Sequence, residues 1–232
     1  MDSLTKDIKR LENITGVVIN FTTPDLLKIA IDSIRKFYDF KIIVIDGSGD
    51  CFLDYPNLEV INVGYNIGHG LGMDMGIKMA QTDYVLTFDT DIEMKKPCLE
   101  LMFEKIKPDT YAIGKMYYIN NGYFYARNRH LFQHGDLAYV VHPSFQIVNK
   151  NEYLKYAPYI SDGAPTVLSY HDIMRHKKEK EILIDFPVLD YIEHRNAGTR
   201  DRLDRSEWEY YSPQNPNWLI KWNEYIKEHP ID

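Results

Sequence analysis

Residues 16–24 read GVVINFTTP, a β-branched apolar run that ends in two threonines and a proline. The first six residues predict a buried strand, because valine and isoleucine favour strands. Thr23 is a residue type preferred just before a helix, and Pro24 suits the first helical turn. In residues 25–38 the apolar side chains recur at helical spacing. The stretch therefore predicts a strand that leads directly into a helix.

The same alternation continues outward through the first hundred residues. Further apolar strands are predicted at residues 41–45 (KIIVI), 58–63 and 84–88 (YVLTF), and a glycine-studded loop enters a helix within 66–81. Continuous apolar strands separated by helices are typical of a parallel sheet covered on both faces. We therefore expect an α/β fold with a Rossmann-like, mainly parallel sheet flanked by helices.

The second half of the chain has a different pattern. Residues 117–125 (YYINNGYFY) place Asn-Gly between aromatic runs, which predicts a hairpin. Further strands are predicted at 138–148 and within 182–192, and a helix over about 162–178. Because no linker-like composition divides the halves, we expect residues 1–232 to form a single domain with a mixed C-terminal extension.

The composition argues against several classes of protein. Of the 232 residues, 44% are hydrophobic, which supports a sizeable core. The net charge of −7 argues against a nucleic-acid binder, which usually needs a basic stripe. No apolar run approaches the about 20 residues that span a bilayer, and residues 1–13 lack the apolar run of a signal peptide. Cys51 and Cys98 show no metal-ligand spacing, so we expect reduced thiols in a soluble cytoplasmic protein whose membrane contact, if any, is peripheral.

The glycine-studded segment does not fit the common nucleotide-binding loops. Met73 and Met75 stand where the third glycine of G-x-G-x-x-G would fall, and the segment follows the third predicted strand rather than the first. The chain also lacks a P-loop and the G-x-S-x-G turn of α/β-hydrolases. These absences argue against a dinucleotide-binding oxidoreductase, a P-loop NTPase and an α/β-hydrolase.

Polar side chains follow each of the four predicted strands of the first half. In open α/β sheets, ligands bind beyond the carboxyl ends of the strands. The residues at these ends are Thr22 and Thr23, Asp46 and Ser48, Asn66, and Asp89 and Asp91. Loops between strands and helices are usually polar anyway. The repetition at all four ends is what indicates a binding site.

Asp89-Thr90-Asp91 is the most specific of these ends, because it follows a buried strand directly. Residues two apart on a strand point to the same side, which brings the two carboxylates together. A hard cation such as Mg²⁺ or Mn²⁺ relieves their repulsion. The alternative is a solvated loop or the cap of a helical segment that starts near Pro97. The position after a buried strand favours the metal site.

Together these features resemble the GT-A fold glycosyltransferases of the inverting, family 2-like type. The resemblance lies in residues 20–24 (NFTTP), 44–50 (VIDGSGD), 66–70 (NIGHG), Gly76, 83–86 (DYVL) and 89–91 (DTD). It covers about residues 15–95, which it implies are the nucleotide-sugar-binding half, and leaves about 96–232 as the acceptor-binding half and tail. It implies a metal-dependent enzyme that moves a sugar from a nucleotide-diphosphate sugar, a UDP-sugar by default, to a hydroxyl of a glycan or other acceptor. Polysaccharide biosynthesis is the expected setting.

The resemblance also implies which residues bind the donor. Thr22 and Asp46 would hold the nucleobase and ribose. Asn66 and the glycine segment that includes Gly70 would approach the ribose and sugar closely, which would explain the small residues. Asp89 would contact the ribose or the sugar.

The metal ligands and the general base are assigned in the same way. Asp91 would bind the Mn²⁺ or Mg²⁺ that bridges the two phosphates, with His194 as the family's late histidine ligand. A metal lets an acidic protein hold a diphosphate, because the ion reverses the local sign of charge. Asp162, before a predicted helix, matches the base that deprotonates the acceptor hydroxyl. Asp172 competes for this role, although mid-helix aspartates are more often surface residues.

Several alternatives stay open from the sequence. A single histidine such as His194 is often structural, and His142 is open to the same doubt. A non-catalytic sugar or nucleotide-sugar binding module of the same fold is the rival function, and a sugar-phosphate nucleotidyltransferase is a third. The intact pair Asp89 and Asp91 together with Asp162 favours the enzyme. Aromatic residues at 117–125 and in the tryptophan-containing tail lie outside the nucleotide half, where an acceptor would be gripped.

Overall fold

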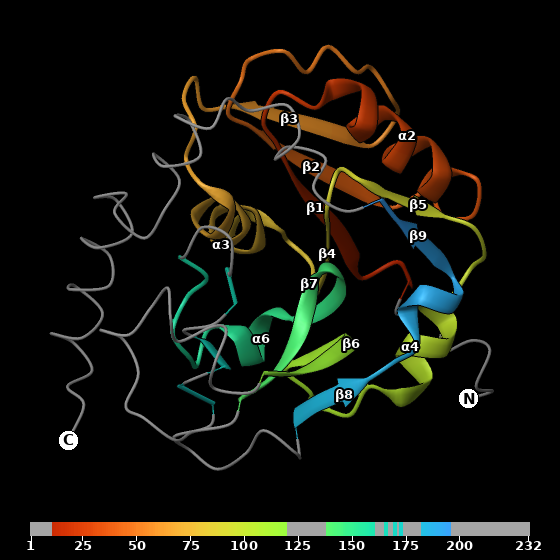
Figure 1. Cartoon of the computed structure of the whole chain (residues 1–232), viewed down its shortest axis with the longest axis vertical. Coiled ribbons are helices and arrows are strands. Elements are labelled where there is room, and N and C mark those ends of the chain that lie inside the picture. Colours follow the sequence, from red (N-terminus) through yellow and green to blue (C-terminus); the bar gives the residue numbers. More distant parts are fainter. Residues whose placement is uncertain are drawn as a thin grey trace, which may run out of the picture.

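A computed structural model describes residues 11–119, 138–160, 165–166, 169–170, 172–173 and 182–195. Within this part of the chain, a seven-stranded sheet has the order β3-β2-β1-β4-β7-β6-β8, and helices lie on both of its faces (Figure 1). A second sheet pairs only β5 and β9. The small sheet also contributes to the core, since Ile92, Met94 and Ile192 belong to one of the clusters of buried apolar side chains.

Four parallel strands form one side of the large sheet. They are β1 (Ile14–Asn20), β2 (Lys41–Asp46), β3 (Leu58–Asn62) and β4 (Tyr84–Phe88). β1 pairs with β2 and with β4, and β2 pairs with β3. Each matches a strand expected from its apolar run, and the bounds of β4 are those predicted. The Rossmann-like, mainly parallel half of the fold is confirmed.

Three more strands make the sheet mixed. β7 (Ala138–Asn149) runs antiparallel to β4 and to β6 (Ala112–Ile119), and β8 (Leu183–Asp185) runs parallel to β6. The predicted mixed extension thus continues the same sheet. Residues 117–119 of the predicted hairpin belong to β6 and pair with β7. The Asn-Gly turn at 121–122 lies outside the described residues, as do most of the predicted helix at 162–178 and the tryptophan tail.

Helices cover the two faces of the sheet. α2 (Pro24–Arg35) and α4 (Leu99–Lys105) lie on one face, and α3 (His69–Met79) and α6 (Lys150–Tyr153) lie on the other (Figure 1). Each face has its own cluster of buried apolar side chains between helices and strands. No helix among the described residues has the length and apolar character needed to cross a membrane.

α3 packs unusually close to β1 because of its glycines. A Cβ on Gly72 would lie 2.7 Å from Ile19 Cγ1, and a Cβ on Gly76 would meet Val17 Cγ1 closer than any real contact. The close approach of helix and strand therefore accounts for glycine at these two positions. Gly68, just before α3, has a φ of 87°, a left-handed conformation that favours glycine.

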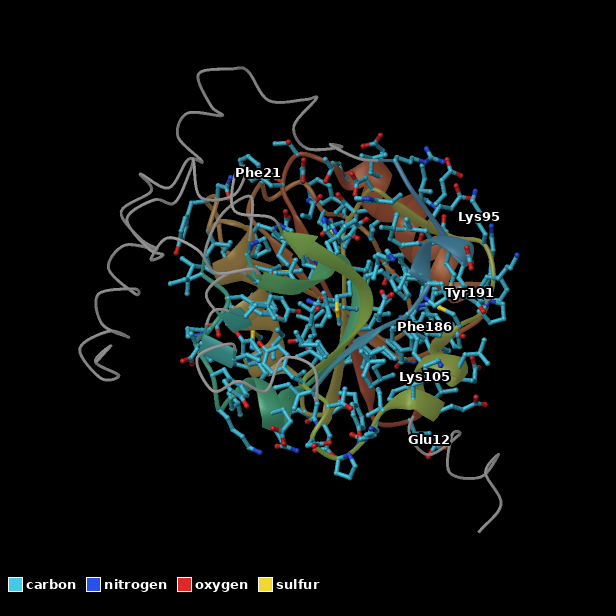
Figure 2. The ribbon with its side chains drawn as sticks, turned by 60° about the horizontal axis from the view of Figure 1, so that its bottom comes forward. Glu12, Phe21, Lys95, Lys105, Phe186 and Tyr191 are labelled. Carbon is cyan, nitrogen blue, oxygen red and sulfur yellow. The ribbon has the colours of Figure 1, made fainter. Side chains whose placement is uncertain are left out.

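The small sheet joins two distant parts of the chain. β5 (Ile92–Met94) follows β4 almost directly and pairs antiparallel with β9 (Ile192–His194), with Ile92 opposite His194. Lys95 and Tyr191, which lie near each other in Figure 2, join the two segments through a hydrogen bond of 2.8 Å from the Lys95 amide to the Tyr191 carbonyl. This pairing brings His194 beside Asp91.

The loop after β1 differs in detail from its prediction. Thr23 precedes α2 and Pro24 occupies its first turn, as expected. However, the Thr23 hydroxyl makes no capping bond to α2. It donates instead to Asn20 Oδ1 at 3.2 Å and lies 3.1 Å from Thr90 Oγ1. Thr23 therefore ties the end of β1 to the loop that follows β4.

Candidate functional site

The carboxyl ends of β1, β2 and β4 meet at one edge of the sheet, because the three strands are parallel neighbours. Figure 2 shows the direction in which β1 runs, because Glu12, which precedes β1, and Phe21, which follows it, lie at opposite ends of the molecule. The chain leaves this edge of the sheet at Asn20, Asp46 and Asp89. In open α/β sheets this edge is where ligands bind.

Asn20 links the ends of β1 and β2 through its amide. Asn20 is fully buried, and its Nδ2 donates to Asp46 Oδ1 at 2.9 Å and to Asp50 Oδ1 at 2.8 Å. The Ser48 hydroxyl lies 2.6 Å from the same oxygen of Asp50. Two carboxylates are thus held together by uncharged donors. Neither Asn20 nor Asp50 was singled out from the sequence, although both stand in the quoted motifs.

Asp46 is tied into the protein by both of its oxygens. Its Oδ1 accepts the backbone N–H of Ser48 at 3.2 Å, in addition to the Asn20 amide, and its Oδ2 accepts the N–H of Cys51 at 3.1 Å. Its exposure is only 1%. These bonds shape the 46–51 loop. Thr22 joins the same loop, since its backbone N–H donates to Ser48 Oγ at 3.0 Å, and it adopts a left-handed φ of 58°.

The loop before α3 lies against the end of β2. Asn66 Oδ1 accepts the N–H of Gly68 at 2.8 Å, which fixes the turn that enters the helix. A Cβ on Gly47 would lie 3.3 Å from Asn66 Cα and 2.9 Å from the Tyr65 carbonyl oxygen. Asn66 is therefore next to the Asp46 loop. Gly70 is buried in the first turn of α3.

Asp89, Asp91 and His194 form a cluster that could hold a metal ion. One ligand atom from each lies within 4.8 Å of the others. His194 Nε2 lies 3.2 Å from Asp91 Oδ1 and 3.8 Å from Asp89 Oδ2. The structure thus brings together the three residues that the sequence resemblance associated with the cation and the sugar.

Two more histidines surround this cluster. His69, the first residue of α3, places Nε2 at 3.3 Å from Asp89 Oδ1. The His142 ring, on β7, lies 5.9 Å from the His194 ring, and Nδ1 of His142 lies 2.7 Å from Ser144 Oγ. Sequence reasoning gave His69 no role, and the only signal for it was its place in the quoted 66–70 motif.

Mutual charges in the cluster shift the pKa values. Burial acts to raise the pKa of Asp89, but pairing with His69 and the nearby His142 and His194 bring it below its usual value. The hydrogen bond with Asp91 raises the pKa of His194, although burial opposes this effect. Burial lowers the pKa of His142 against the attraction of Asp89. Because a ligating imidazole is neutral, a metal ion that binds His194 must displace any proton it carries.

The donor set fits a divalent cation. Two carboxylates supply the hard oxygen ligands that Mn²⁺ and Mg²⁺ prefer, and an imidazole nitrogen is a common further ligand of transition metals. Asp91 is 7% exposed, so that its charge is partly shielded from water and gains from a counter-ion. Arg195, which directly follows β9, pairs with Glu93 at 2.9 Å.

The candidates for the acceptor side are only partly described. Tyr117 on β6 is 43% exposed, and its ring lies 5.3 Å from the ring of His142. Asp162 lies outside the described residues. Asp172 is 7% exposed, and its Oδ2 accepts the N–H of Ala157 at 2.9 Å. The expectation of a surface position for Asp172 is therefore wrong, since its carboxylate anchors the segment that follows α6.

Comparison with known proteins identifies a family model that matches most of the chain. The model of "Glycosyl transferase family 2" matches residues 16–166, about two thirds of the chain. No curated protein matches the chain in sequence.

Solved structures share the fold. One is the mannosyltransferase PcManGT from Pyrobaculum calidifontis in complex with GDP-Man and Mn²⁺, with a TM-score of 0.54 and 14% identity over 80% of this chain. This chain spans 62% of the length of that one. Another is glucosyl-3-phosphoglycerate synthase from Mycobacterium tuberculosis in complex with Mn²⁺, UDP-Glc and glycerol 3-phosphate. It has a TM-score of 0.55 and 17% identity, over 92% of this chain and 83% of its own. At such identities the likeness shows the GT-A type of fold.

Proposed function

The chain belongs to glycosyl transferase family 2, and from that membership we propose that it transfers a sugar from a nucleotide-diphosphate sugar to a hydroxyl group, with inversion at the anomeric carbon. The observation that carries the proposal is the cluster of Asp89, Asp91 and His194 at the carboxyl end of β4. It lies at the sheet edge where the loops after β1 and β2 also begin. A donor's diphosphate and its nucleoside would meet at that edge.

The loops after β1 and β2 are proposed to bind the nucleoside. The burial of Asp46 favours a supporting role, in which it shapes the loop from Ser48 to Cys51 through its two oxygens. Thr22 and Asp50 are less buried members of the same network and are proposed to face the base and ribose, with Asn66 and Gly70 nearby. The neighbours hold GDP-Man and UDP-Glc respectively. A UDP-sugar is our default donor.

Asp91 and His194 are proposed to hold the cation, with Asp89 beside them. Nucleophilic displacement at the anomeric carbon leaves negative charge on the departing diphosphate, and a bound divalent ion would neutralise it. The ligands include an imidazole, which favours Mn²⁺ over Mg²⁺ because Mg²⁺ takes oxygen ligands. Both neighbouring structures named above contain Mn²⁺.

The acceptor is proposed to be a glycan or another hydroxyl compound. Its hydroxyl is a weak nucleophile, so a carboxylate that accepts its proton lowers the barrier. We assign this base to Asp162. The alternative, Asp172, already accepts a hydrogen bond from the Ala157 amide in a buried position, which favours a structural role. The exposed Tyr117 is proposed to line the acceptor side, because aromatic faces suit sugar rings.

Nucleotide-sugar binding that depends on the cation tests the proposal. We expect Mn²⁺ with a UDP-sugar or GDP-sugar to raise the unfolding temperature of the chain, because a ligand that binds only the folded state stabilises it. Asp91→Ala should abolish this Mn²⁺-dependent shift, whereas Asp109→Ala, an exposed carboxylate after α4, should leave it intact. If no nucleotide-sugar stabilises the chain, or if Asp91→Ala keeps the full shift, the proposed site is wrong.

Turnover separates the enzyme from a non-catalytic binding module. Transfer or slow hydrolysis of the donor, followed by NMR of the product anomer, should show release of the nucleoside diphosphate with an inverted sugar configuration. Asp162→Asn should retain donor binding and lose transfer. Donor binding without any release of nucleoside diphosphate would favour the binding module. Full transfer by Asp162→Asn would remove that residue from the role of base.

A further inference from the structure

The carboxylate of Asp89 is shared between two elements that are far apart in the chain. Its Oδ1 lies 3.3 Å from His69 Nε2 on α3, and its Oδ2 lies 3.8 Å from His194 Nε2 on β9. Oδ1 is shielded from solvent and accepts no hydrogen bond from the described part of the chain, so the 3.3 Å contact with His69 is an ion pair. Among the described residues, His69 is the one ion-pair partner of Oδ1, and a buried carboxylate oxygen without a partner is costly. The two oxygens of Asp89 therefore contact different histidines, His69 through Oδ1 and His194 through Oδ2.

The backbone that carries His69 is fixed by contacts that need no ligand. Gly68, which precedes it, has a left-handed φ of 87° and donates its N–H to Asn66 Oδ1 at 2.8 Å. Two turns of α3 are then seated on β1 through Gly72 and Gly76. A side chain at the start of such a seated helix can hold a neighbouring group in one orientation.

We propose that His69 is a positioning residue of the metal site. Its imidazole presents Nε2 to Oδ1 of Asp89 at ion-pair distance, so that Oδ2 stays turned toward Asp91 and His194. The proposal rests on the proposed function, because it takes these three residues as the metal-binding set. His69 is not a member of that set, in which the ligand atoms lie within 4.8 Å of one another.

The expected size of the effect follows from metal sites in general. Carboxylates that bind a metal are themselves held by outer hydrogen bonds, and loss of such a partner typically weakens metal binding about 10- to 100-fold. Without His69, the Asp89 carboxylate is free to rotate, and its shielded oxygen loses that partner. The ion then has to reorient Asp89 when it binds.

Direct Mn²⁺ titration of the full chain by calorimetry, without any nucleotide-sugar, tests this role. Glutamine places its amide nitrogen near the position of histidine Nε2, whereas asparagine places it near Nδ1. We expect His69→Ala and His69→Asn to weaken Mn²⁺ binding about tenfold or more, and His69→Gln to recover most of the loss. Lys78→Ala, in the last turn of the same helix, is the matched control and should bind Mn²⁺ like the wild type. Circular dichroism checks that each variant is folded.

Pulsed EPR of bound Mn²⁺ separates positioning from direct ligation. We expect the same number of ligating ¹⁴N nuclei in the wild type and in His69→Gln, since the imidazole ligand is His194. Loss of a ¹⁴N coupling in His69→Gln would make His69 a ligand and overturn the proposal. The proposal is also overturned if His69→Asn binds Mn²⁺ as well as the wild type, or if His69→Gln binds Mn²⁺ no better than His69→Asn. The comparison of these two variants decides the question even if His69→Ala does not fold. These outcomes leave the proposed function standing. A wild-type chain that does not bind Mn²⁺ alone would overturn the positioning role of His69, whereas the proposed function fails only in the thermal-shift test with nucleotide-sugars.

Discussion

Gly76 offers a test of how α3 is seated on the sheet. In a helix interior, replacing glycine by alanine normally stabilises by about 1 kcal/mol, because glycine has more backbone entropy to lose. The structure predicts the opposite for Gly76→Ala. The new methyl group would overlap Val17 Cγ1 and would also lie 3.2 Å from Val17 Cγ2 and 3.3 Å from its Cβ.

The expected cost follows from the surroundings of Val17. Its side chain is fully buried on β1, a strand with paired neighbours on both sides, so it has little room to move away. Overpacking of a core typically costs about 1–3 kcal/mol, and an overlap of this kind belongs at the upper end of that range. After the gain in helix propensity is subtracted, we expect Gly76→Ala to lose about 2 kcal/mol. For a chain of 232 residues, this lowers the unfolding temperature by about 4–8 °C.

Urea unfolding followed by circular dichroism measures the change, and Val17→Ala provides the matched background. Removal of the two Val17 methyl groups clears the space that the methyl group introduced by Gly76→Ala needs. In that background, Gly76→Ala should stabilise the chain by about 1 kcal/mol, as helix propensity alone predicts. If Gly76→Ala stabilises the wild type, or if its cost is the same in both backgrounds, Val17 does not limit the space at Gly76.

Three further predictions concern buried polar contacts. Ser33→Ala removes the acceptor of the Met94 amide, a hydrogen bond of 2.8 Å that joins α2 to β5. It should lower the free energy of unfolding in urea by about 1–3 kcal/mol and weaken Mn²⁺ binding. Mn²⁺ affinity equal to that of the wild type would contradict the link between this bond and the small sheet. Tyr38→Phe removes the hydroxyl that accepts the backbone amides of Cys98 and Leu99 at the start of α4, at 2.8 and 3.0 Å. It should lower the free energy of unfolding by about 1–3 kcal/mol in the same assay and leave Mn²⁺ affinity unchanged. A stability equal to that of the wild type would show that these bonds do not hold α4. Asn20→Ala leaves the Asp46 and Asp50 carboxylates without their shared amide donor. Thermal-shift measurements should therefore show a lower unfolding temperature and a smaller shift on addition of nucleotide. A nucleotide-dependent shift equal to that of the wild type would remove this network from the donor site.

Local patterns predicted the parallel half of the large sheet because β1, β2 and β4 are mostly apolar, buried runs. The bounds of β4 follow directly from YVLTF, since the polar Asp83 and Asp89 flank it. β5 escaped detection because a strand of three residues has no periodicity to read, and β9 begins only at the last residue of the range 182–192 in which short strands were predicted. Their pairing depends on a contact between segments separated by much of the second half of the chain.

In the candidate site, too, some residues could be predicted from local sequence and others could not. Asp89 and Asp91 are close in sequence, so the chemistry of a D-x-D after a buried strand could be read directly. The environment of Asp89 could not be predicted from the sequence, because His69 reaches Asp89 only through the packing of α3 on β1. Asn20 carries no sequence signal of its own, since its importance arises from the two carboxylates that the adjacent strand brings to it.

The pairing of β5 with β9 has a consequence for how the chain unfolds. Asp91 and His194 meet only after the chain between them has been ordered, and contacts that close such long loops form late. An ion held by both residues therefore stabilises the native state far more than the folding transition state. Its binding energy then appears as slower unfolding rather than faster folding. The cation would act as a clasp that prolongs the lifetime of the closed chain, in addition to its part in the chemistry.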